Sequence, residues 1–85
     1  MSQLDVLAET VKLARLLGTS AESLDYLKPL GAAQLRELRE RLSEAEFART
    51  RPIFQRVAQA AKLLPNALVA TIGEKIFGAV LCARV

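Results

Sequence analysis

Few side chains in this 85-residue sequence could carry out chemistry. It has no histidine, the commonest general base and metal ligand, and Cys82 is its only cysteine. One acid, Glu74, lies in a strongly apolar stretch, and Lys75 follows it directly. Acid–base catalysis needs several titratable groups that converge in a cleft, and an isolated pair does not supply them. We therefore predict no catalytic residue, no metal site and no cofactor, and we expect that the protein is not an enzyme.

The apolar stretch around this pair, residues 66–85, is expected to form a helix at the centre of the fold. On a helical wheel, small and polar residues of this stretch share one narrow arc, and the other positions are mostly apolar. The arc is either a narrow strip of helix surface exposed to water or a groove in which small residues let another helix approach closely. In the second case Glu74 and Lys75 would fix the register. The candidate interface residues are Thr71, Glu74, Lys75, Gly78 and Cys82, joined by Leu16 from the first helix.

The same stretch is long enough to cross a membrane, at about 30 Å as a helix. Two charges at mid-span oppose insertion, because each costs about 2.5–3.5 kcal/mol there. We expect no membrane span and a buried helix of a soluble protein.

The N-terminus carries Asp5 and Glu9 where a signal peptide needs basic residues. With a lone cysteine, which cannot form an internal disulfide, this favours the cytoplasm.

The composition indicates an all-α protein. Hydrophobic residues make up 52% of the chain but aromatic residues only 5%, and four glycines and three prolines leave little material for turns. A chain of this length forms one domain at most. The net charge of +3 is too small to indicate a nucleic-acid partner.

Local signals divide the chain into four or five helices. Gly18 is suited to end the first, Thr19 and Glu22 form a capping box for the second, and Pro29 should stop it at Lys28. Ser43 and Glu46 form another capping box, flanked by Leu42 and Phe47 as a hydrophobic staple, which favours a break at Ser43. Pro52 predicts a kink or a fresh start, and Asn66 is a suitable N-cap. The expected fold is a compact bundle, or the start of a helical repeat, with helices over about 3–17, 20–28, 31–42, 44–64 (kinked near Pro52) and 66–85.

Apolar periodicity predicts which faces are buried. In the first helix, Leu4, Leu7, Ala8, Val11 and Ala14 should point inward, and Asp5, Glu9 and Lys12 should lie on the opposite face. In the third helix, Leu35, Leu38, Leu42 and Ala45 form a narrow seam. The charged residues around that seam, from Arg36 to Glu44, are expected in water, with the pairs Glu37–Arg41 and Arg36–Glu40 four residues apart.

Two segments share a Leu-x-Pro pattern: Leu27-Lys28-Pro29 and Leu63-Leu64-Pro65, each before an apolar helix. This pattern resembles α-solenoid modules such as the cytosolic helical domain of bacterial magnesium transporters, where Leu-x-Pro often opens a helix. The resemblance implies a helical-repeat fold and carries over no residue role. The sequence stops at Val85 without a capping residue, which favours an N-terminal piece of a longer helical protein over a terminus buried in a dimer.

These features favour an interaction or scaffold module that self-associates through residues 66–85. The alternative is a helix-turn-helix regulator that offers Gln34, Arg36 and Arg39 to DNA bases. Nucleic acid is the less favoured partner, because Glu37 and Glu40 on the same helix would repel phosphates. A run of basic residues without an acid supplies a weak hint of a nucleic-acid surface: Arg49, Arg51, Arg56 and Lys62.

Overall fold

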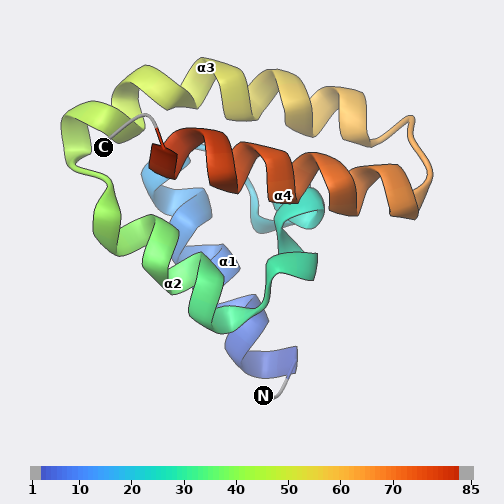
Figure 1. Ribbon diagram of the computed structural model, residues 1–85, viewed down its shortest axis with the longest axis horizontal. Helices are drawn as coiled ribbons and strands as arrows, with labels where there is room; N and C mark the ends of the chain where they lie inside the picture. The colour runs from blue at the N-terminus through green and yellow to red at the C-terminus, as the bar shows by residue number, and fades with distance from the viewer. Residues whose placement is uncertain (1–2, 83–85) are drawn as a thin grey trace.

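The computed structural model describes residues 3–82, which form four α-helices and one 3-10 helix (Figure 1). This confirms the predicted all-α bundle. In chain order the elements are α1 (Gln3–Leu17), η1 (Ala21–Leu30), α2 (Ala32–Arg41), α3 (Glu44–Ala61) and α4 (Asn66–Cys82). In Figure 1, α3 and α4 run antiparallel as a hairpin along one side of the molecule, and α1 and α2 lie on the other.

Two helix boundaries follow from local signals as predicted. Gly18 takes a φ of 69°, and the amides of Gly18 and Thr19 donate to the carbonyls of Arg15 and Ala14, which closes α1 with a Schellman motif. At the next break, the Ser43 hydroxyl accepts from the Glu46 amide, and the Glu46 carboxylate accepts from the Ser43 amide. The reciprocal capping box therefore begins α3 at Glu44, with Phe47 buried behind it.

The segment after Gly18 differs from its prediction. Its cap is Ser20, whose hydroxyl accepts from the amide of Ser23, and not Thr19 paired with Glu22. It is a 3-10 helix with non-helical backbone at Leu24, and it continues through Pro29 to Leu30. Pro29 does not end it, because a proline near the end of such a short element removes only one amide hydrogen bond.

The two later prolines mark different features. Helix α3 continues without a break through Pro52, so no fresh start occurs there, and it ends at Ala61, three residues before the predicted end. Asn66 is the first residue of α4 and not its cap, because the Pro65 carbonyl already accepts from the amides of Leu68 and Val69. The Leu-x-Pro segments are thus not equivalent, since Pro29 lies inside η1 and Pro65 precedes α4. Residues 83–85, where the sequence lacks a capping residue, lie outside the described part of the chain.

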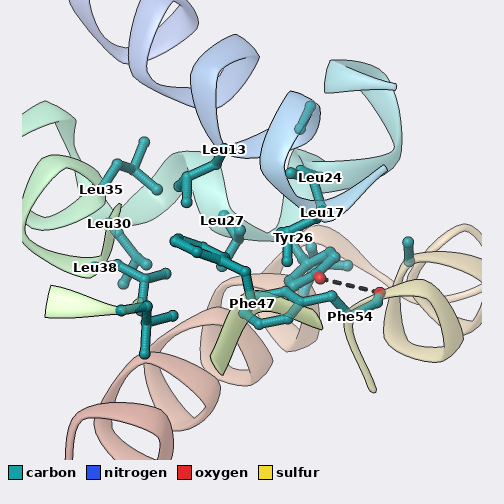
Figure 2. Close-up of a cluster of buried hydrophobic side chains, with 14 residues drawn as sticks. Leu13, Leu17, Leu24, Tyr26, Leu27, Leu30, Leu35, Leu38, Phe47 and Phe54 are labelled. Atoms are coloured by element: carbon teal, nitrogen blue, oxygen red, sulfur yellow. Dashed lines mark hydrogen bonds between the residues drawn. The ribbon is translucent and has the colours of Figure 1, made fainter. Parts of the chain in front are cut away.

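The short element η1 is the centre of the packing. It contacts all four α-helices, and it buries Leu24, Tyr26, Leu27 and Leu30 (Figure 2). Tyr26 is fully buried, and its hydroxyl donates to the carbonyl of Phe54 at 3.1 Å. The centroid of its ring lies 6.4 Å from the centroid of the Phe54 ring. Burial raises the pKa of this hydroxyl well above its usual range.

Helix α4 does not lie at the centre of the fold, contrary to the sequence prediction. Only Val69 and Gly73 of this helix are buried, although Glu74 and Lys75 are its only charged residues. The helix packs mainly on η1, a 10-residue element that can cover only one side of a helix about 25 Å long. The helix therefore buries one face and leaves the other in contact with water.

Candidate interaction surface

The predicted interface residues of α4 share one surface of the molecule. Thr71, Glu74, Lys75 and Cys82 are exposed, and Gly78 between them is partly exposed. A Cβ added to Gly78 would meet no atom within 4 Å, so the backbone there faces open space. We call these five residues, together with exposed Ala67, the outer face of α4.

The opposite face of α4 determines this orientation. Gly73 packs so closely on η1 that an added Cβ would overlap the carbonyl oxygen of Tyr26. Val69, one turn earlier, belongs to the hydrophobic core. This close backbone contact of α4 inside the chain is made at Gly73, on a different side of the helix from Gly78. Because η1 fixes the Gly73 side, the outer face points away from the core.

Leu16 does not belong to the outer face. It is a half-buried residue of α1 that packs against the hydrophobic core. Its carbonyl accepts a hydrogen bond of 2.8 Å from Nε of Arg51 on α3. Leu16 therefore takes part in the packing of α1 and α3 within this chain.

Apolar side chains extend the surface along one edge of the outer face. Leu68 is 51% exposed, next to Ala67 at the start of α4. Further along, a shallow groove of about 450 Å³ lies between α3 and α4, lined by five apolar and three polar residues. The lining residues are Leu42, Glu46, Arg49, Thr50, Ile53, Ile76, Ala79 and Val80.

The charges on the outer face have no partner within the described residues. No described side chain forms an ion pair or hydrogen bond with the carboxylate of Glu74 or the ammonium of Lys75. The Thr71 hydroxyl, in contrast, donates to the Ala67 carbonyl at 3.1 Å, which leaves its methyl group on the surface. The outer face therefore combines small groups with two opposite charges.

A second charged cluster, which the sequence analysis missed, lies between α1 and α2. The Glu9 side chain is only 4% exposed. Its Oε2 accepts from Nε and Nη2 of Arg39 at 3.2 and 3.1 Å, and its Oε1 accepts from Nε of Arg36 at 3.3 Å. The ammonium of Lys12 lies 3.6 Å from Oε1. One buried carboxylate is thus compensated by three basic side chains.

This cluster shifts the protonation equilibrium of Glu9. Burial raises the pKa of its carboxyl, because the charged form loses water. Hydrogen bonds from Arg39 and Arg36, with the charges of Arg39 and Lys12, outweigh that effect and hold the pKa below its ordinary value. The carboxylate is therefore the stable form in the fold.

The cluster corrects the predicted face of α1. Glu9 and Thr10 are buried, whereas Leu4, Leu7 and Ala8 are exposed. The prediction was wrong because it gave the inward face to the apolar residues of the first two turns. The four-residue spacing from Glu9 to Leu13 and Leu17, both fully buried, was the signal that could have found it.

On α2, the predicted seam is buried at Leu35, Leu38 and Leu42, but Ala45 lies beyond the break and is exposed. Of the two predicted ion pairs, Glu37–Arg41 forms at 3.2 Å. Arg36 turns to Glu9, and no bond joins it to Glu40.

Within residues 3–82, no group of three His, Cys, Asp or Glu side chains converges to hold a metal ion. In the same range, no helix has both the length and the apolar character needed to cross a bilayer. The two arginines proposed to read DNA bases, Arg36 and Arg39, both donate to Glu9.

No protein-family model, curated protein or solved structure matches this chain.

Proposed function

We propose that this chain is a non-enzymatic helical interaction module that binds protein through the outer face of α4 and self-associates there. The observation that carries the proposal is the position of α4. It is the most apolar helix of the chain, yet it buries only Val69 and Gly73 and leaves Leu68 half exposed. The proposed setting is the cytoplasm, where a lone thiol such as Cys82 stays reduced.

A partner that covers the exposed apolar surface of α4 would gain binding free energy from that burial. Burying apolar surface contributes about 25 cal/mol per Å², so covering the exposed half of Leu68 contributes about 1 kcal/mol. Small residues around Thr71 and Gly78 allow a neighbouring helix to approach, because the distance between packed helices depends on the side chains at the contact. A second molecule also offers Glu74 and Lys75 the partners that the described chain does not provide.

The test is sedimentation velocity of the chain over a range of concentrations. We expect concentration-dependent association, weakened several-fold in Leu68→Ser, because the exposed leucine loses its apolar contact. Leu63→Ser is the matched control: Leu63 is 88% exposed in the turn between α3 and α4 and should leave association unchanged. A monomer at every concentration, or equal weakening by both substitutions, would contradict the proposal.

The same samples test the alternative of a nucleic-acid-binding regulator. The basic residues Arg49, Arg51, Arg56 and Lys62 are exposed on and just after α3. Binding to nonspecific duplex DNA that weakens with salt would support that alternative. No binding at low salt would remove it.

A further inference from the structure

The inference concerns how a second copy would lie on the outer face of α4, and it rests on the proposed function. Successive residues of a helix are separated by 100°, so Glu74 and Lys75 project on opposite edges of the line through Thr71 and Gly78, roughly 50° to each side. They differ in height by about 1.5 Å. Each edge of the face therefore carries one charge at nearly the same level, negative on one side and positive on the other.

This pattern distinguishes the two ways in which identical helices can pair about a two-fold axis. In a parallel pair the axis runs along the helices, and each edge of one copy meets the opposite edge of the other. Glu74 then faces Lys75 of the second copy on both sides. In an antiparallel pair equal edges meet, which places Glu74 near Glu74 and Lys75 near Lys75.

We infer that the outer face of α4 pairs with a second copy of this chain in a parallel two-fold arrangement, held by two reciprocal Glu74–Lys75 ion pairs. Both side chains are exposed and have no ionic partner among the described residues, so neither gives up an internal bond to form the pair. At the line between them, Gly78 and the methyl group of Thr71 present little bulk. The helices can approach until the two edges meet.

The arrangement also determines what faces Cys82. This free, exposed thiol projects close to the central line, two turns after Lys75. In a parallel pair it faces Cys82 of the second copy. In an antiparallel pair centred on Glu74 and Lys75 it faces Ala67.

Charge variants test the ion pairs by the dimer dissociation constant. In the parallel pair, Glu74→Lys and Lys75→Glu each place like charges together at both edges, and each should raise the Kd about ten-fold at low salt. The double variant Glu74→Lys/Lys75→Glu restores opposite charges and should return to within about three-fold of the original Kd. This recovery separates a lost ion pair from a damaged fold.

Thiol cross-linking tests the direction. Diamide oxidises two thiols to a disulfide and takes up their two protons and two electrons. Treated with diamide, the chain should form a Cys82–Cys82 dimer that Cys82→Ser abolishes. In Ala67→Cys, peptide mass spectrometry should find 67–67 and 82–82 links in a parallel pair, and mixed 67–82 links in an antiparallel one.

The outcomes separate this inference from the proposed function. Dimers with mixed 67–82 links, or dimers whose Kd is unchanged by both single charge variants, would overturn the parallel arrangement and leave the interaction module intact. A chain that stays monomeric would overturn both. If the Kd of the double variant stays as high as that of the single variants, the reciprocal ion pairs do not hold the dimer.

Discussion

Glu9 and Glu74 are both helical glutamates with basic residues near them in the sequence, yet the fold treats them differently. The Glu9 side chain is 4% exposed and bonded to Arg36 and Arg39 from another helix. Glu74 is exposed and has no ionic partner among the described residues. Glu9 needs ionic partners, because a buried charge without them costs several kcal/mol. Glu74 does not, because water solvates an exposed charge. The ion pairs of Glu9 therefore stabilise the fold, whereas the charge of Glu74 is stabilised by water.

The same contrast holds between the two faces of α4. Gly73 on the inner face touches the backbone of Tyr26, and Gly78 on the outer face touches nothing within 4 Å. Substitutions of these two glycines should therefore differ in their effect on stability.

The largest effect is expected at the inner glycine. Gly73→Ala places a methyl group on the Tyr26 carbonyl, and the resulting shift of α4 from η1 should cost about 3 kcal/mol in the free energy of unfolding. Gly78→Ala is the matched control, and it should stabilise the chain by up to about 1 kcal/mol because alanine favours the helix. Urea denaturation followed by circular dichroism measures both. Equal effects of the two substitutions would mean that α4 does not pack on η1 through Gly73.

A smaller effect is expected at the buried carboxylate. Glu9→Ala leaves Arg36 and Arg39 close together without their anion and should lower the free energy of unfolding by about 2 kcal/mol. The matched substitution Glu74→Ala should change it by less than about 0.5 kcal/mol, because that side chain is solvated. The comparison fails if denaturation gives the two variants the same stability.

The two arginines around Glu9 should differ from each other. Arg39 donates two hydrogen bonds and is less exposed than Arg36, which donates one. We expect Arg39→Ala to cost about 1.5 kcal/mol and Arg36→Ala less than about 1 kcal/mol. Thermal unfolding of the single and double variants measures this order, and a reversal would show that exposure does not control the strength of these pairs.

The smallest effect is the acid dependence that Glu9 gives to the wild-type chain. Its pKa in the fold lies below that of the unfolded chain, so its stabilising contribution is complete above the unfolded pKa of about 4.3. That contribution is lost as the pH falls toward the folded pKa. Melting temperatures between pH 7 and pH 3 should fall less steeply in Glu9→Gln than in the wild type or in Glu74→Gln. A curve for Glu9→Gln that parallels the wild type would contradict this assignment.

Features that depend on neighbouring residues could be predicted from the sequence alone. The capping box of Ser43 and Glu46 and the glycine end at Gly18 were predicted because their hydrogen bonds join residues a few positions apart. The arc of small and polar residues on α4 was found for the same reason, since one helix determines which of its side chains share a face.

Tertiary structure decided which faces meet. Glu9 can be buried because α2 brings two arginines to it, and the spacing within α1 indicates the buried face but not these partners. Gly73 became the close contact, and α4 took a peripheral position, because η1 offers a carbonyl and four buried side chains at the centre. Helix ends are set by bonds between sequence neighbours, whereas burial depends on the surfaces that distant segments present to one another.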